Sequence, residues 1–278
     1  MEKIKVDNLS FSYPSSDKLA LDSVSLSIPE SEFVVLCGKS GCGKSTLLRH
    51  LKKSMNPYGN KFGSVCFDGE EIGEMSDRDA ASKIGYVQQN PDNQLVTDKV
   101  WHELAFGLES LGYSNSVIKR RVAEMASYFG IQTWFRKSVS ELSGGQKQLL
   151  NLASVMAMQP EVLILDEPAS QLDPIAARDF LSTVHRLNRE LGVTIIISEH
   201  RLEEIFPLAD RAIVMDAGRI IANAKPSEVA IQLAGSGEDD VHPMYYGMPP
   251  VMKLFPKELV RWQDSLPMTL REGRILME

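Results

Sequence analysis

The first fifty residues change from alternating to continuous hydrophobicity. Residues 4–6, 11–13 and 21–28 alternate apolar and polar side chains, which is typical of strands with one face in water. Residues 32–36 form a nearly continuous apolar run, as expected of a strand buried on both faces. Glycines and a helical pattern from residue 44 to about 53 follow directly. We therefore predict a small antiparallel β region, and after it the strand, glycine loop and helix that begin an α/β unit.

The middle of the chain has a helical pattern, and the α/β pattern returns after it. Candidate helices at 101–111, 116–130 and 145–158 predict an inserted helical subdomain over residues 91–158. Beyond Pro160, apolar strands alternate with helices, which predicts a parallel sheet covered on both faces. The expected strands are 162–165, 193–197, 212–215 and 219–222, and the expected helices are 174–191 and 201–207.

The chain from residue 225 onward has a weaker pattern. Residues 236–250 are rich in turn-forming residues and predict a loop. Beyond them, Phe255, Leu259 and Trp262 fall on one face of a helix. That face could pack on its own domain or contact a partner, and the pattern favours neither.

Composition narrows the classes of function. The chain has 278 residues, and 43% of them are hydrophobic, enough for the core of one large domain with an appendage. Lys and Arg number 30 against 37 Asp and Glu, and the formal charge of −7 argues against a general nucleic-acid binder. Three cysteines favour a reducing compartment such as the cytoplasm. The longest apolar runs are too short for a membrane span, and no export signal is expected at the N-terminus.

A glycine-rich segment follows the first buried strand. Residues 38–45 fit the phosphate-loop pattern G-x-x-x-x-G-K-[ST] between a predicted strand and a predicted helix. The glycines let main-chain N–H groups surround an anion, and the helix adds the positive end of its dipole. Lys44 is expected to reach the β and γ phosphates of a nucleotide, and Ser45 to bind Mg²⁺. The residues expected to contact the nucleotide are Gly38, Lys39, Ser40, Gly41, Cys42, Gly43, Lys44, Ser45 and Thr46.

Cys42 gives this loop a thiol. A reagent attached to the thiol is expected to block nucleotide binding sterically, because Cys42 lies among the residues that should surround the phosphates.

Two acids follow the apolar strand at 162–165. Asp166 is expected to bind Mg²⁺, directly or through water. Glu167, at the strand tip, could orient and deprotonate the water that attacks a γ phosphate. Two solvated acids capping a strand would fit this segment alone, but the phosphate loop favours the second half of a phosphoryl-transfer site.

The sequence favours ATP over GTP. Guanine-binding proteins of this class usually carry N-K-x-D, and the nearest string, residues 60–63, lacks the acid. Tyr13 precedes the phosphate loop and could stack on the base, although a half-buried strand tyrosine fits the spacing equally well.

A second pair of glycines begins the last predicted helix of the helical segment. Ser143 is well placed to cap that helix, and Gly144 and Gly145 expose its first N–H groups next to Gln146. These residues form a second anion site, but one ATP has one γ phosphate. The second site must therefore serve a nucleotide held elsewhere, or complete a site that two chains share.

These motifs resemble those of the nucleotide-binding subunit of an ATP-binding cassette (ABC) transporter, and they occur in the same order over about residues 3–230. By this resemblance, residues 38–45 are the Walker A loop, 142–146 the signature, and Asp166 and Glu167 the Walker B pair with its catalytic base. Tyr13 matches the aromatic residue that stacks on adenine in this family.

Three more residues take roles from the resemblance alone. Gln89 matches the glutamine that senses Mg²⁺ and water and couples to the membrane subunit. His200 matches the switch histidine that should touch the γ phosphate, and Asp173 lies in the loop through which paired ATPases communicate.

The resemblance implies a fold and a mechanism. The fold is α/β: a RecA-like P-loop NTPase core with a parallel sheet, an N-terminal antiparallel β subdomain, an inserted α-helical subdomain and a short C-terminal extension. The ABC ATPase domain would cover residues 1–230, with its β subdomain and core in 1–90 and 159–230, and the extension would cover 231–278. Two such domains hold two ATPs head to tail, so ATP closes the dimer and hydrolysis reopens it.

Residues 90–94, Val100 and residues 105–109, together with residues 198–204, are similar to one branch, the ATPases of energy-coupling factor (ECF) importers of vitamins or Co²⁺ and Ni²⁺. Residues 266–274 resemble the segment that closes each half of tandem proteins in this branch, so the chain could be a separate subunit or half of a tandem. The implied partners are a second ABC ATPase, the same or different, a transmembrane coupling protein and, indirectly, a substrate-capturing membrane protein. The implied location is the cytoplasmic face of the membrane, and no nucleic-acid partner is expected.

Three residues depart from the family pattern, namely Gln88, Leu149 and Gln171. None of them removes a catalytic group, so we expect an active ATPase that uses ATP and Mg²⁺. The alternatives are the ATPase of another ABC transporter class and, less expected, a soluble ABC ATPase that acts on nucleic acid or ribosomes. Such soluble proteins generally carry a coiled-coil insertion, a second cassette or a basic arm, none of which this sequence shows.

Overall fold

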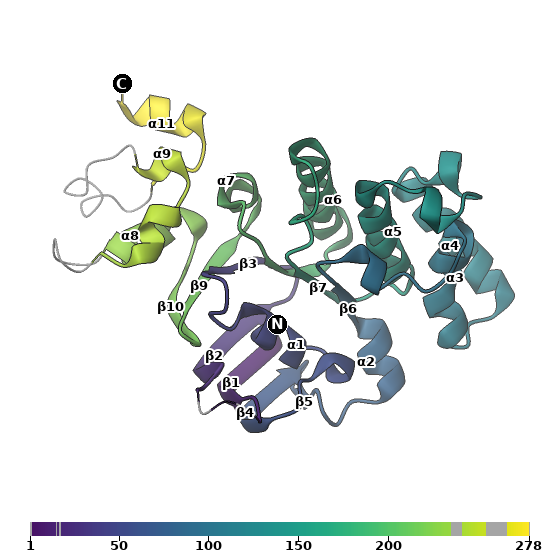
Figure 1. Ribbon diagram of the computed structural model, residues 1–278, viewed down its shortest axis with the longest axis horizontal. Helices are drawn as coiled ribbons and strands as arrows, with labels where there is room; N and C mark the ends of the chain where they lie inside the picture. The colour runs from purple at the N-terminus through teal and green to yellow at the C-terminus, as the bar shows by residue number, and fades with distance from the viewer. Residues whose placement is uncertain (1, 15, 17, 235–240, 254–265, 278) are drawn as a thin grey trace.

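The computed structural model describes residues 2–14, 16, 18–234, 241–253 and 266–277. This part of the chain contains two sheets and a set of helices (Figure 1). The strands are β1 (Glu2–Ser12), β2 (Leu21–Pro29), β3 (Phe33–Gly38), β4 (Asn60–Phe67), β5 (Glu70–Glu71), β6 (Ile84–Val87), β7 (Val162–Asp166), β8 (Thr194–Ser198), β9 (Arg211–Asp216) and β10 (Arg219–Ala224). The α-helices are α1 (Lys44–His50), α2 (Asp77–Lys83), α3 (Val100–Ser110), α4 (Asn115–Tyr128), α5 (Gly144–Ala157), α6 (Pro174–Leu191), α7 (Leu202–Ile205), α8 (Pro226–Ala234), α9 (Pro250–Lys253) and α11 (Leu270–Met277).

The larger sheet has the strand order β10-β9-β3-β8-β7-β6. Its inner pairs are parallel, and only the edge strand β10 pairs antiparallel, with β9. Parallel strands joined through helices all end at the same edge of a sheet. The loops after β3, β7 and β8, together with the segment after β6, therefore meet along one edge.

Two hydrophobic cores lie on the two faces of this sheet. Every residue of β3 is buried, and alternate side chains enter different cores. Phe33 and Val35 pack into the larger core with α3 to α6, whereas Val34 and Leu36 pack into a smaller core with α1 and the antiparallel sheet. The antiparallel sheet, of order β2-β1-β4-β5, therefore covers α1 and supports the loop that precedes it.

The predicted fold class is confirmed: a parallel core, an antiparallel sheet and a helical segment at α3 to α5. Several elements differ in detail or were not predicted, among them β1, β4, β5, β6, α2 and α8. β1 is one strand rather than two, and it bends at Asn8, where φ is 47° and the register with both neighbours shifts. β4 has an irregular burial pattern, and β6 is only four residues long, so neither has a clear period in the sequence.

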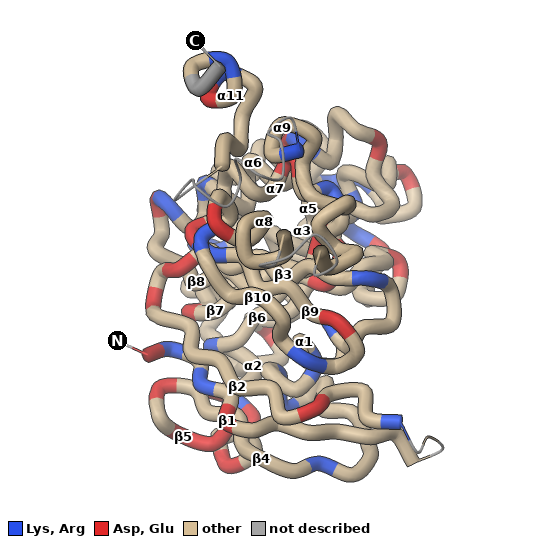
Figure 2. Tube along the Cα trace, turned by 90° about the vertical axis from the view of Figure 1, so that its left-hand side faces the viewer, with Lys and Arg blue, Asp and Glu red and all other residues tan. Residues whose placement is uncertain are grey.

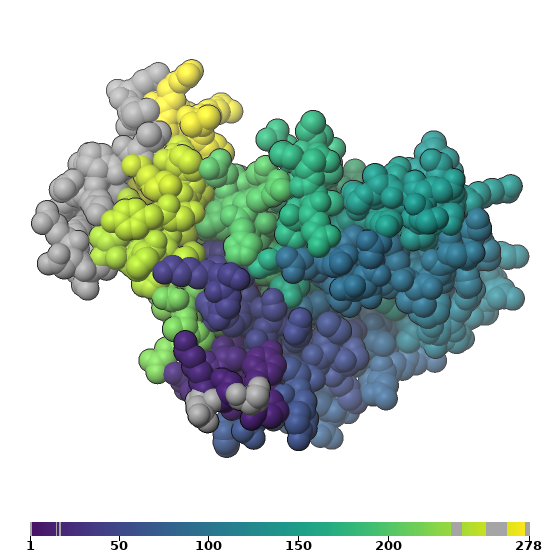
Figure 3. Space-filling model, in the orientation of Figure 1, coloured from purple at the N-terminus to yellow at the C-terminus, as the bar shows by residue number. Residues whose placement is uncertain are grey.

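The C-terminal extension packs on the larger core in its described part. Met248, Met252 and Leu266 are buried in that core, and His242 Nε2 lies 3.1 Å from the Asp216 carboxylate at the end of β9. The helical segment and the extension lie at opposite ends of the molecule (Figures 1 and 3). The expected face of Phe255, Leu259 and Trp262 lies outside the described residues, as does part of the expected loop at 236–250. Among the helices that the structure describes, none has both the length and the apolar character of a membrane span.

Two glycines of the antiparallel sheet give a matched test of its packing. Gly63 and Gly69 have φ of 84° and 83°, but a Cβ at Gly63 would lie 2.5 Å from the Asn8 carbonyl oxygen, whereas one at Gly69 would contact nothing within 4 Å. We expect Gly69→Ala to cost about 1 kcal/mol of unfolding free energy through its backbone conformation. Gly63→Ala should cost about 1–3 kcal/mol more, because the sheet must shift. Urea unfolding monitored by circular dichroism measures both, and equal losses would contradict the close approach of β1 and β4.

Candidate functional site

The loop between β3 and α1 lies against the main chain of two other segments. Gly38 has a φ of 152°, and a Cβ there would lie 2.3 Å from the Met215 carbonyl oxygen. Gly43 has a φ of 109°, and a Cβ there would lie 2.5 Å from the Ala20 carbonyl oxygen. Glycine is therefore required at both positions. The opposite side of the loop borders a cavity of about 420 Å³, which is lined by Tyr13, Ala20, Ser40, Gly41, Gly43, Lys44, Ser45, Thr46, Gln89 and Glu167.

The Lys44 side chain is folded back inside this loop. Its Nζ donates hydrogen bonds to the carbonyl oxygens of Gly38 at 2.9 Å and Lys39 at 3.2 Å, and it lies 3.8 Å from Glu167 Oε1. Lys44 is 4% exposed, so its charge is only weakly screened by water. A buried ammonium beside the open face of the loop suits the binding of a polyphosphate.

The Asp166 carboxylate is held by three hydroxyl groups. Ser45 Oγ and Ser198 Oγ each donate to Asp166 Oδ1 at 2.9 Å, and the Tyr86 hydroxyl donates to Oδ2 at 3.2 Å. Burial and the neighbouring Asp166 raise the pKa of Tyr86 well above its ordinary value, so its hydroxyl keeps the proton that it donates. Sequence reasoning did not select Tyr86 or Ser198, although both lie at the ends of strands beside β7.

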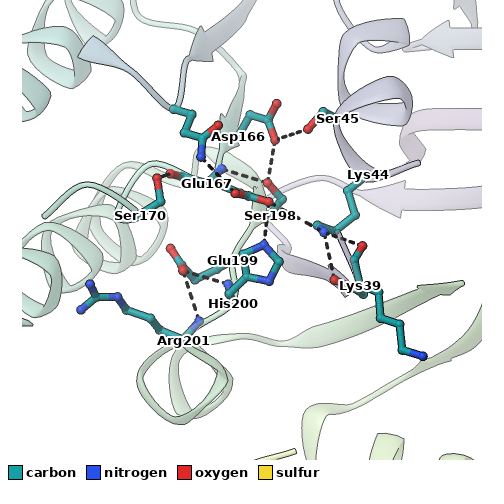
Figure 4. A network of polar contacts seen from close by, with 12 residues as sticks. Lys39, Lys44, Ser45, Asp166, Glu167, Ser170, Ser198, Glu199, His200 and Arg201 are labelled. Atoms are coloured by element: carbon teal, nitrogen blue, oxygen red, sulfur yellow. Dashed lines mark hydrogen bonds and ion pairs between the residues drawn. The ribbon is translucent and has the colours of Figure 1, made fainter. Parts of the chain in front are cut away.

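Glu167 contacts side chains from neighbouring loops at the edge of the sheet (Figure 4). Its Oε1 lies 2.7 Å from His200 Nε2, and its Oε2 accepts a hydrogen bond from Gln89 Nε2 at 3.2 Å. Its φ is 47°, an uncommon value for a residue other than glycine, and its N–H donates to Ser198 Oγ at 2.9 Å. Strained backbone of this kind is concentrated at functional sites.

The oxygen donors of the site fit a magnesium ion. Ser45 supplies a hydroxyl, Asp166 a carboxylate and Gln89 an amide oxygen near the open face of the loop. Mg²⁺ prefers such oxygen ligands, and it commonly binds one or two protein groups together with phosphate oxygens and water. The described part of the chain contains no group of three or more His, Cys, Asp or Glu placed to hold a metal. The oxygens of Ser45, Asp166 and Gln89 fit a Mg²⁺ ion that is also bound by phosphate oxygens of a nucleotide.

Tyr13 lies at the mouth of the cavity, just after β1. It is half-buried, its hydroxyl lies 3.2 Å from Thr46 Oγ1, and its ring meets Phe11 edge-on at 4.9 Å. The residue is thus both a strand-end tyrosine that packs locally and a lining residue of the cavity, and its stacking on a base stays a prediction.

The second glycine pair lies apart from this cavity. Ser143 Oγ accepts the Gln146 N–H at 3.3 Å, and Gln146 Oε1 accepts the Ser143 N–H at 3.0 Å, which forms a capping box at the start of α5. A Cβ at Gly144 would meet nothing within 4 Å, whereas Gly145 packs against Ala176 of α6. Ser143, Gly145 and Gln146 line a different cavity of about 250 Å³ between α5 and α6.

Asp173 is also outside the first cavity. Its Oδ1 accepts the N–H groups of Ile175 and Ala176, both at 3.0 Å, and so caps α6. The structure therefore brings Lys44, Ser45, Gln89, Asp166, Glu167 and His200 together, and it leaves the capped starts of α5 and α6 as separate surfaces.

Comparison with known proteins identifies the family of the chain. The family model ABC_tran, described as ABC transporter, matches residues 21–170. A putative ABC transporter ATP-binding protein of Bacillus cereus is 45% identical over 274 residues, which cover 98% of this chain and 48% of that protein. The solved structure of cbiO1 from Clostridium perfringens, described as part of the ABC transporter complex cbiONQ, has 32% identity and a TM-score of 0.74, and covers 82% of this chain and 91% of that chain. The dimeric structure of MJ0796, described as a bacterial ABC transporter cassette, has 25% identity and a TM-score of 0.68 over 80% of this chain and 98% of that one.

The fold and the phosphate loop define a P-loop nucleotide-binding protein of the cassette type. The chain belongs to the ABC transporter family. It spans about half the length of the Bacillus relatives that it matches.

The cysteines test how the phosphate loop is packed. Cys42 is 5% exposed, and its side chain lies in the smaller core rather than in the cavity, so burial raises its pKa. Burial also raises the pKa of Cys37 to about 12, whereas Cys66 is only half-buried.

We expect a maleimide to label Cys66 first and to reach Cys42 and Cys37 only on unfolding, because the thiolate is the reactive form. Mass spectrometry of wild-type and Cys66→Ser protein measures this order. Fast labelling of Cys42 in native Cys66→Ser protein would contradict the buried position and restore the expectation that the thiol faces the phosphates.

Proposed function

We propose that this chain is the ATP-binding and ATP-hydrolysing part of an ECF-type membrane importer. The observation that carries the proposal is the convergence of Lys44, Gln89, Glu167 and His200 on the open face of the phosphate loop. Four loops of the parallel sheet supply these side chains, and each side chain can act on a bound triphosphate or on its attacking water. The branch is supported by the similarity to cbiO1 of the cbiONQ complex.

The chemistry follows from the groups around Glu167. With ATP in the cavity, the loop N–H groups and the Lys44 ammonium hold the phosphates, and Glu167 accepts a proton from a water molecule. The water oxygen attacks the γ phosphorus, the bond from that phosphorus to the β,γ-bridging oxygen breaks, and ADP and phosphate are the products. His200 and Gln89 hold the Glu167 carboxylate in position. A Mg²⁺ ion held by Ser45 and Asp166 would neutralise charge on the phosphate oxygens.

The separate start of α5 supports a site shared between two cassettes. Gly144 leaves the first N–H groups of this helix accessible, but these groups border a different cavity from Lys44. A second cassette placed head to tail would bring its own α5 start to the γ phosphate on this chain. The dimeric cassette MJ0796 and the double length of the Bacillus relatives support such pairing, with the partner domain in another copy or in a longer chain.

A groove beside Gln89 is suited to a transmembrane coupling protein. A cavity of about 330 Å³ between the sheet and α3 is mainly apolar and includes Val96, Phe106 and Met158. Gln94, which also lines it, accepts the Gln88 N–H at 2.9 Å and donates to the Tyr86 carbonyl at 2.9 Å. A partner in this groove would therefore contact the segment that carries Gln89.

The remaining partners and the location follow from this assembly. The chain would lie at the cytoplasmic face of the membrane through its membrane subunits, and a separate membrane protein would capture the vitamin or metal ion. Acidic and basic residues are interspersed along the described chain in the view of Figure 2, which supports the absence of a nucleic-acid partner.

Replacement of Glu167 tests the hydrolytic role. Glu167→Gln should bind ATP like the wild type, because Lys44, Ser45 and Asp166 remain. Its turnover should fall at least about a hundredfold, the usual size of a general-base effect. Phosphate release and equilibrium binding of a fluorescent ATP analogue measure the two quantities. Glu203→Gln, an exposed acid on α7, is the matched control and should keep wild-type turnover. An unchanged rate in Glu167→Gln would remove the residue from its role.

Complementation between two defective chains tests the shared site. Lys44→Ala should lose the phosphate-binding half, and Ser143→Arg should block the α5 half, so that either protein alone is inactive. A mixed dimer contains one intact site, and the mixture should therefore hydrolyse ATP faster than either variant. Native mass spectrometry confirms that mixed dimers form. Mixed dimers without restored turnover would rule out a site shared by two copies of this chain.

A further inference from the structure

The loop that carries His200 is built around a buried carboxylate. Glu199 follows β8 and is 1% exposed. Its Oε1 accepts hydrogen bonds from the main-chain N–H groups of His200 at 2.8 Å and of Arg201 at 3.2 Å (Figure 4). Its Oε2 is also buried and has no hydrogen-bond partner within the described residues. Burial of a carboxylate with one unsatisfied oxygen opposes folding, so stability alone does not explain its presence.

The two hydrogen bonds fix the main chain on both sides of the His200 Cα atom. Hydrogen bonds to a carboxylate are about twice as strong as bonds between neutral groups. The His200 side chain itself is 47% exposed, so packing holds it weakly. Its 2.7 Å contact with Glu167 Oε1 therefore depends on the direction that the main chain gives to the side chain.

Arg201 extends the same loop to a neighbouring one. Its Nη2 donates a hydrogen bond at 2.9 Å to the carbonyl oxygen of Leu172, the residue before Asp173. The start of that neighbouring loop is also fixed, because Ser170 N and Oγ donate to the Glu167 carbonyl at 3.2 and 2.8 Å. A continuous series of contacts thus runs from Glu167 through the segment up to Leu172 to Arg201, and from His200 back to Glu167.

We propose that Glu199 and Arg201 are positioning residues that link His200 to the loop ending at Asp173. Glu199 fixes the main chain that presents the imidazole to Glu167, and Arg201 ties that main chain to Leu172. Movement of the loop ending at Asp173, caused by pairing of two cassettes, would then move His200. The inference rests on the proposed function of the site, and it adds two residues that are not among those lining the phosphate-side cavity.

Variants at Arg201 test the link between the loops. Arg201→Met keeps the aliphatic stem and removes the donor, so kcat for ATP should fall on the order of tenfold through misplacement of His200. The Hill coefficient for ATP should also fall, while equilibrium ATP affinity stays at the wild-type value. Arg201→Lys should recover part of kcat, and Arg120→Met, at an exposed arginine of α4, should match the wild type. A wild-type kcat in folded Arg201→Met protein overturns the proposal, and so does an equal loss of kcat and ATP affinity.

Variants at Glu199 test the carboxylate. Glu199→Gln keeps an oxygen that can accept both N–H groups and should hydrolyse ATP at close to the wild-type rate. Glu199→Leu removes the acceptor and should lose kcat without losing ATP affinity. Equal rates in these two variants overturn the role of Glu199. If Glu199→Leu does not fold, the Arg201 variants decide the proposal.

The Glu167→Gln variant, measured in parallel, separates this inference from the proposed function. If Glu167→Gln is impaired and Arg201→Met is not, the inference fails and the proposed function stands. If both variants retain wild-type turnover, the proposed function fails as well.

Discussion

The buried Asp166 carboxylate holds the site together. It ends β7, and it accepts hydrogen bonds from Ser45 at the start of α1, from Tyr86 in β6 and from Ser198 at the end of β8. A hydrogen bond to a charged group contributes about 1.5–3 kcal/mol, and removal of one partner leaves a buried charge less well satisfied. The phosphate loop, the strand before Gln89 and the strand before His200 are thus tied to one side chain, and Glu167 is the next residue along the chain.

The sheet makes this arrangement possible. Because β3, β6, β7 and β8 are parallel and buried on both faces, their ends lie along one edge, and residues more than a hundred positions apart come into contact. The segment before β2 and the turn between β9 and β10 pack against the back of the phosphate loop. Gly218, in the turn after β9, donates its N–H to the Cys42 carbonyl at 3.0 Å, and His242 of the extension contacts Asp216 in the same turn.

The predictability of each element depended on its length and its period. β3, β7 and β8 are buried throughout and mainly apolar, and α6 has one apolar face along its length, so their bounds were predicted to within one or two residues. β4 and β6 were missed because one is irregular and the other has four residues. Sequence position also misled at Cys42: the loop turns this side chain into the smaller core, and Cys42 is not among the residues that line the phosphate-side cavity.

The sequence by itself determined the family of the chain and the position of its phosphate-loop motif, because phosphate binding requires glycines, a lysine and a hydroxyl at fixed spacing within one short segment. It also indicated that the start of α5 serves a separate anion site, since that site could not be matched to the same γ phosphate. Only the tertiary structure decided which side chains surround the acids. Tyr86 and Ser198 reach Asp166, and Glu199 and Arg201 support the loop of His200, through contacts between strand ends that no local pattern records. Hydrogen bonds between distant segments depend on the order of strands in the sheet, and that order is a property of the whole fold.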